Sequence, residues 1–113
     1  MEGDLDAELQ ERRKRLDEAL DPIVRHLVRM GAQLVVLFGS EARGERNPMA
    51  DLDILAVMET AEPFVERLAR AYRELRPGVA LDLLIYTPKE FDLMRVKPFV
   101  QRILEEGRVL YAA

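Results

Sequence analysis

The chain has 113 residues, which is enough for one compact domain and too few for two. Hydrophobic residues at 49% and charged residues at 34% exclude an intrinsically disordered chain, and the absence of cysteine excludes disulfides and thiolate metal sites. The net charge of −4 argues against a protein that grips a long nucleic acid. No window is long and apolar enough to span a membrane, and the first residues lack the features of a secretory signal, so we expect a cytoplasmic protein.

The first predicted element is a helical segment from about residue 5 to residue 30. Its apolar residues recur at spacings of three and four, as on one face of an amphipathic helix: Leu16, Leu20, Ile23, Val24, Leu27 and Met30. Pro22 lies inside this pattern and can divide the segment into two helices, with Asp21 capping the second. The basic run within residues 11–15 is flanked by acids and indicates a solvated helix face, and His26 is expected to be a packing or surface residue.

The remaining elements alternate between strands and helices. We predict a buried strand, a polar connection, a second strand, a helix, a third strand, a helix start with a capping box, a last helix and a short apolar tail. In order, these cover Leu34–Phe38, Ser40–Ala50, Asp51–Met58, about Glu62–Leu75, Val79–Tyr86, Thr87–Glu90, about Pro98–Glu106 and Val109–Tyr111. We therefore expect a single domain over residues 1–113, with a helical segment at about 5–30, a core at about 31–90 and a C-terminal helix at about 98–106.

Two carboxylates begin the second predicted strand. Asp51 and Asp53 are one residue apart, so both side chains project from the same face, roughly 7 Å apart along the strand. Two such carboxylates repel each other, and the arrangement becomes favourable when cations lie between them. Taken alone, the pair is equally compatible with two solvated acids beside a loop.

A third carboxylate, Asp82, lies in the third predicted strand. Its neighbours Leu81 and Leu83 belong to an apolar run that we expect to be buried on both faces of the sheet. An unpaired carboxylate there would cost several kcal/mol or stay protonated. Asp82 should therefore either form a salt bridge with an arginine or bind metal ions together with Asp51 and Asp53.

Gly39 and Ser40 follow the first predicted strand. A strand that ends in glycine and leads into a helix start exposes backbone N–H groups and a hydroxyl, which together can bind a phosphate oxygen. Arg43 and Arg46 follow within reach of a polyphosphate. A simple strand-to-helix turn with a serine cap is the alternative, and the absence of a Gly-Lys-Ser/Thr sequence excludes a P-loop.

Together these motifs resemble a known superfamily. The segment LFGSEARGERNPMADLDILAV, followed by VALDLLIY, resembles the DNA polymerase beta-like nucleotidyltransferases, with Gly-Ser after the first strand, Asp-x-Asp on the second and Asp on the third. Ten residues separate Ser40 from Asp51, a spacing similar to that of the minimal nucleotidyltransferases, the antitoxin partners of HEPN-domain toxins. Many members have serine immediately before the first aspartate, where this chain has Ala50.

This resemblance implies an α/β domain of the α+β type, with the nucleotidyltransferase fold and a small mixed sheet. Gly39-Ser40 ends the first strand and the Asp-x-Asp pair begins the second, yet both must meet one triphosphate, so these strands should run antiparallel. The helix at about 62–75 connects the second and third strands, which should therefore be parallel.

The resemblance also implies an activity. Two Mg²⁺ ions, or Mn²⁺, would bind Asp51, Asp53 and Asp82, while Gly39, Ser40 and Arg43 would bind the phosphates of a nucleoside triphosphate. The expected reaction transfers AMP from ATP to an acceptor hydroxyl, typically a tyrosine of a HEPN toxin, which would be silenced. Because the chain has no room for an acceptor domain, a partner or a second subunit in a homo-oligomer should supply it. A small-molecule transferase of the aminoglycoside type and a non-catalytic subunit that neutralises a partner by contact are the alternatives.

Overall fold

The computed structural model describes residues 2–44 and 52–113. Five helices and four strands follow one another in the described residues, and the three expected strands and the expected helices at about 62–75 and 98–106 are among them. In chain order they are α1 (Glu2–Arg29), β1 (Ala32–Phe38), α2 (Gly39–Ala42), β2 (Leu52–Met58), α3 (Phe64–Leu75), β3 (Leu81–Tyr86), α4 (Pro88–Met94), α5 (Pro98–Glu106) and β4 (Arg108–Ala112).

The strands form one mixed sheet in the order β3-β2-β1-β4. β1 and β2 are antiparallel and β2 and β3 are parallel, which confirms the predicted topology. The segment expected to be an apolar tail is instead a fourth strand, β4, which pairs antiparallel with β1. β3 and β4 are therefore the two edges of the sheet.

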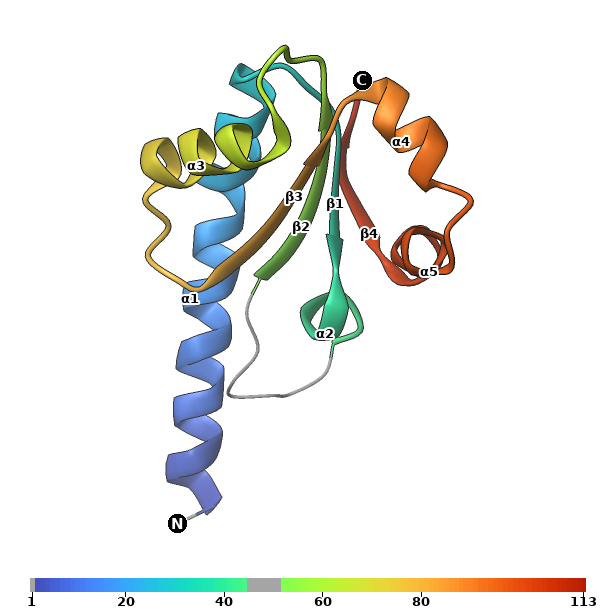
Figure 1. Cartoon of the computed structure of the whole chain (residues 1–113). Helices are drawn as coiled ribbons and strands as arrows, with labels where there is room; N and C mark the ends of the chain where they lie inside the picture. Colours follow the sequence, from blue (N-terminus) through green and yellow to red (C-terminus); the bar gives the residue numbers. More distant parts are fainter. Residues whose placement is uncertain (1, 45–51) are drawn as a thin grey trace.

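Helices cover both faces of this sheet (Figure 1). α1 and α3 lie on one face, where the larger core cluster includes Leu27, Val35 and Ile54. α4 and α5 lie on the other face, where Leu55 and Ile103 belong to the smaller cluster. Successive residues of a strand point to opposite faces of the sheet, so alternate strand residues pack in two separate core clusters.

The long helix α1 is continuous through Pro22, so the expected division into two helices is wrong. Pro22 is exposed, so water can reach the carbonyl group that its missing N–H leaves unpaired, while the buried Leu20 and Ile23 hold the helix to the core on both sides of it. Leu16 is the first of the described side chains of α1 to be buried, and the helix N-terminal to it projects beyond the end of the sheet (Figure 1). None of the described helices is long and apolar enough to cross a membrane.

A buried arginine joins α3 to β3 and α4 at one end of the sheet. Arg67 is 4% exposed, and its guanidinium donates to the carbonyl oxygens of Glu62 (2.7 and 3.0 Å) and Ile85 (3.1 Å) and to the Glu90 carboxylate. Glu90 also forms the predicted capping box with Thr87. The Arg67 hydrogen bond, and after it the Thr87 backbone N–H, lower the pKa of Glu90.

Candidate active site

Four of the residues predicted to carry chemistry lie at the other end of the sheet. Gly39 and Ser40 directly follow β1, Asp53 is the second residue of β2, and Asp82 is the second residue of β3. Phe38 pairs with Asp53 across β1 and β2, and Asp53 pairs with Asp82 across β2 and β3. The mixed topology thus brings three segments of the chain together at one end of the sheet.

Asp53 and Asp82 lie side by side on one face of the sheet. They are register partners on neighbouring parallel strands, which lie about 4.8 Å apart, so their side chains project in the same direction. Leu52 and Leu81, one position earlier, are buried in the core on the opposite face, beneath α1 and α3. The two carboxylates therefore share the face that α4 and α5 cover farther along the strands.

Gly39 is the point of closest approach between the β1–α2 turn and these carboxylates. Its φ of +76° is in the left-handed region that favours glycine. A Cβ atom at this position would also collide with the Asp53 carboxylate. Gly39 is thus required twice, once for the backbone conformation and once to leave room for Asp53.

Ser40 lies inside the first turn of α2. The residue that precedes the helix is Phe38, and no side chain caps it, so the alternative of a serine cap is not what the structure shows. Within the helix, the Arg43 N–H donates to the Gly39 carbonyl oxygen. The N–H groups of the first turn have no such partner inside a helix, and they lie beside the half-buried Ser40.

Two ion pairs anchor α2 to other helices. Glu41 is only 8% exposed and lies 3.8 Å from the Arg13 guanidinium of α1. Arg43 lies 3.3 Å from the Glu106 carboxylate of α5. The burial of Glu41 is not predictable from the sequence, because an acidic residue that a distant helix covers and a solvated one have the same local pattern. The predicted phosphate contact of Arg43 stays a prediction.

Asp82 is exposed, so the expectation that both faces of its strand would be buried is wrong. β3 is an edge strand, and α4 and α5 do not reach over the end of it that carries Asp82. Within residues 2–44 and 52–113, no arginine or lysine pairs with Asp82, which removes the reason to regard it as one half of a buried salt bridge.

Three residues of the sequence analysis, Asp51, Arg46 and Ala50, lie outside the described residues. In the described part of the chain, no group of three or more acids or histidines gathers at one point. Asp53 and Asp82 nevertheless place two carboxylates on neighbouring strands at this end of the sheet, where Asp82 is exposed. Hard divalent cations such as Mg²⁺ prefer oxygen ligands of this kind, so the donor set fits them.

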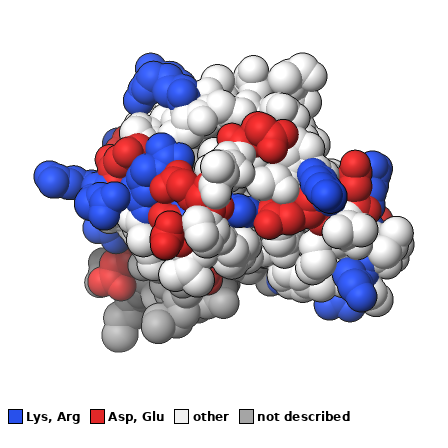
Figure 2. Space-filling view, turned by 45° about the horizontal axis from the view of Figure 1, so that its top comes forward, with Lys and Arg blue, Asp and Glu red and all other residues white. Residues whose placement is uncertain are grey.

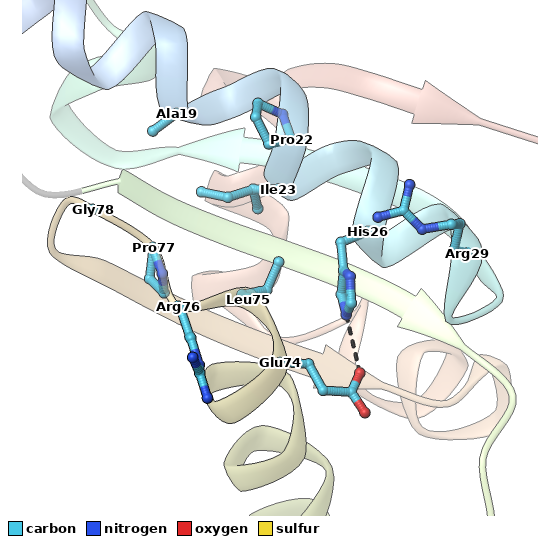
Figure 3. Close-up of a pocket in the computed structure, with 10 residues that line it drawn as sticks. All are labelled: Ala19, Pro22, Ile23, His26, Arg29, Glu74, Leu75, Arg76, Pro77 and Gly78. Carbon is cyan, nitrogen blue, oxygen red and sulfur yellow. Dashed lines mark hydrogen bonds and ion pairs between the residues drawn. The ribbon is translucent and has the colours of Figure 1, made fainter.

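His26 lies away from these carboxylates, in a pocket on the opposite side of the sheet. The pocket has a volume of about 400 Å³ and lies between α1 and the C-terminal end of α3 (Figure 3). The His26 Nε2 atom lies 3.0 Å from the Glu74 carboxylate, and this contact joins the two helices. His26 therefore has a packing role, as the sequence analysis expected.

The surface charges of the described residues are mixed in sign. Figure 2, in which the top of the molecule as drawn in Figure 1 is tilted toward the viewer, shows lysines and arginines interspersed with aspartates and glutamates. No broad basic patch covers the described residues on this face. The absence of a long nucleic-acid partner stays a prediction from the net charge of −4.

Comparison with known proteins identifies the family. A family model described as a nucleotidyltransferase domain matches residues 11–111. A protein of Methanocaldococcus jannaschii, provisionally named a protein adenylyltransferase, is 35% identical over 77 residues, which cover 68% of this chain and 76% of that protein. A crystal structure of a provisionally named nucleotidyltransferase from Sulfolobus solfataricus has the same fold, with a TM-score of 0.65 and 22% identity over 93% of this chain and 87% of that one. The chain belongs to the nucleotidyltransferase domain family.

Proposed function

We propose that this nucleotidyltransferase transfers AMP from ATP to a tyrosine of a HEPN-type helical toxin and thereby acts as its antitoxin. The observation that carries the proposal is the in-register pair of Asp53 and Asp82 beside the Gly39 turn. The similarity to a protein named as a protein adenylyltransferase supports a protein acceptor. The spacing between Ser40 and Asp51, which is similar to that of minimal nucleotidyltransferases, supports the antitoxin role.

Asp51, Asp53 and Asp82 would hold two Mg²⁺ ions, or Mn²⁺, in this proposal. Bound there, the ions would lower the pKa of the acceptor hydroxyl and neutralise charge on the triphosphate. The exposure of Asp82 leaves its carboxylate accessible to such ligands, and its register with Asp53 places the backbone positions of the two residues side by side.

The chain's own residues then have distinct tasks in an in-line transfer. Asp82 accepts the proton of the acceptor hydroxyl as its oxygen forms a bond to the α-phosphorus. The bond from that phosphorus to the bridging oxygen breaks, and pyrophosphate leaves. Ser40 and the N–H groups of the first turn of α2 bind the β- and γ-phosphates, with Arg43 as a further contact. Asp53 would hold the divalent cations that bring the triphosphate and the acceptor together, and this placement would reduce the entropic part of the barrier.

Incubation with α-labelled ATP, Mg²⁺ and a lysate of the source cells tests this function. We expect label to enter one protein band. A phosphatase should not remove this label, because the α-phosphate lies in a diester between AMP and tyrosine. Asp53→Asn should lower labelling on the order of 100-fold to 1,000-fold, because one preorganised charge is lost from the reacting centre. Asp92→Asn is the matched control, because Asp92 is an exposed aspartate of α4 far from the site.

Other outcomes of the same assay contradict the proposal in distinguishable ways. Label in a small molecule rather than a protein would indicate a transferase of the aminoglycoside type. A wild-type protein that labels nothing, while still binding a partner in the lysate, would indicate a non-catalytic subunit. Loss of labelling in both the Asp53 and the Asp92 variants would mean that the effect of Asp53→Asn does not come from the site.

A further inference from the structure

The strand that carries Asp82 lies at the edge of the sheet. β3 pairs with β2 on one side only, and the Leu52 N–H donates to the Ala80 carbonyl oxygen across that pair. Backbone groups alternate in direction along a strand, so the groups of Leu81 and Leu83 point away from β2. An edge strand normally leaves such groups to water, which allows it to twist and shift.

Tyr72 of α3 occupies this free edge. Its hydroxyl donates to the Leu81 carbonyl oxygen at 2.8 Å and accepts from the Leu83 N–H at 3.0 Å. One side chain thus makes both hydrogen bonds that a neighbouring strand would make at this point. The helix that presents it is fixed in turn, because Ala71 is buried and Leu68 packs against the core.

Asp82 is the residue between those two backbone groups. In the part of the chain that the structure describes, no side chain holds the Asp82 carboxylate by a hydrogen bond or an ion pair. Its position therefore depends on the backbone of β3, which β2 holds on one side and Tyr72 on the other. Reacting groups generally need placement within about 0.5 Å of the productive geometry.

We propose that Tyr72 is a positioning residue that holds Asp82 beside Asp53. This role rests on the proposed function, in which Asp82 takes the proton of the acceptor hydroxyl. Tyr72 itself touches neither nucleotide nor acceptor, because it reaches β3 from the α1 and α3 side of the sheet and bonds only its backbone. The Tyr72 hydroxyl, and not its ring, makes the hydrogen bonds that hold β3 in position.

Tyr72→Phe tests the role because it removes the hydroxyl and leaves the ring. Tyr86→Phe is the matched control: Tyr86 lies at the other end of the same strand, where its ring packs against Phe64. In Tyr72→Phe we expect the amide hydrogen of Leu83 to exchange with solvent at least about tenfold faster, since its acceptor is lost. The control should leave that exchange rate unchanged.

Two functional readouts separate positioning from a merely structural role. The kcat for AMP transfer should fall roughly tenfold to 100-fold in Tyr72→Phe, with a much smaller change in the KM for ATP, because misplacement of Asp82 affects the reacting geometry most. Binding of Mn²⁺ alone, measured by electron paramagnetic resonance, should weaken in the same variant. Both quantities should stay at wild-type values in Tyr86→Phe, and melting curves establish that each variant is folded at the assay temperature.

The outcomes distinguish this role from the proposed function. Unchanged kcat and Mn²⁺ affinity in Tyr72→Phe overturn the positioning role, whether or not the Leu83 amide exchanges faster. An equal fall in Tyr86→Phe also overturns it, because the effect would then belong to β3 as a whole. A wild-type protein that neither transfers AMP nor binds Mn²⁺ overturns the proposed function and the positioning role together.

Discussion

The two ends of the sheet hold their charged groups in opposite ways. At the end where α3 meets α4, the Arg67 guanidinium is buried, and two carbonyl oxygens and the Glu90 carboxylate accept its hydrogen bonds. At the other end, Asp82 is exposed, and nothing among the described side chains pairs with it. Asp53, its neighbour in the sheet, is half-buried beside a glycine.

This difference separates stability from function within one small domain. A buried charge without partners costs several kcal/mol, so the Arg67 end must satisfy its charge in order to fold. The carboxylates at the site end are placed by backbone register and by the space beside Gly39, and Asp82 stays accessible. Changes at the site end should therefore affect mainly activity, and changes at the Arg67 end mainly stability.

Gly39→Ala should produce the largest effect, and it acts at the site end. The new methyl group would displace the Asp53 carboxylate, so we expect AMP transfer to fall on the order of 100-fold or more. The left-handed backbone should in addition cost about 1 to 2 kcal/mol of unfolding free energy. Transfer kinetics and a denaturant melt on the same preparation measure both effects.

Gly44→Ala is the control that separates these two effects. Gly44 has a φ of +73°, nearly equal to that of Gly39, but a Cβ atom there would meet no atom of residues 2–44 and 52–113 within 4 Å. It should lose a similar amount of stability and keep its transfer activity. Equal losses of activity in the two variants would mean that backbone strain, and not the close approach to Asp53, is responsible.

Glu90→Gln should produce a smaller effect, on stability alone. Glutamine can keep the capping box with Thr87, so the variant removes mainly the charge that faces Arg67. Because the Glu90 side chain is 40% exposed, solvent screens the pair, and we expect a loss of only about 1 kcal/mol or less at neutral pH. AMP transfer per folded molecule should not change.

The same pair predicts a direction of pH dependence. The pKa of Glu90 is lowered in the folded protein, so its contribution to stability is complete above its ordinary pKa of 4.5. That contribution should be lost as pH falls below this value through the folded pKa, and the melting temperatures of wild type and Glu90→Gln should converge. Glu66→Gln, which removes an exposed charge of α3, serves as the control. A difference between wild type and Glu90→Gln that widens toward low pH would contradict this account.

The sequence was sufficient to predict three of the four described strands and their relative directions. The constraint was chemical, since Gly39 at the end of one strand and Asp53 at the start of the next must reach the same ligand. The capping box at Thr87 and Glu90 was also predictable, because its pattern is local. Local motifs, together with the requirement that two of them bind the same ligand, are therefore enough to predict most of the fold around the site.

Features that depend on distant packing were not predictable in this way. β4 is five residues long and owes its strand geometry to pairing with β1, more than 70 residues earlier in the chain. The exposure of Asp82 follows from the edge position of β3, which the apolar run around it does not reveal. Arg67 is buried because carbonyl oxygens from two other segments and Glu90 accept its hydrogen bonds, and a helical pattern of apolar residues gives no sign of them.

Melting of the wild type and Asp82→Asn across a Mn²⁺ titration tests the central claim most directly, namely that the carboxylates at this edge of the sheet act together as a cation site. Asp82 is exposed, so Asp82→Asn should be as stable as the wild type without metal. The wild type should gain stability with the logarithm of free Mn²⁺, by about 2.7 kcal/mol at 100 times the dissociation constant, and the variant should gain much less. A wild type that is indifferent to Mn²⁺, or a variant that is badly destabilised without it, would contradict the account.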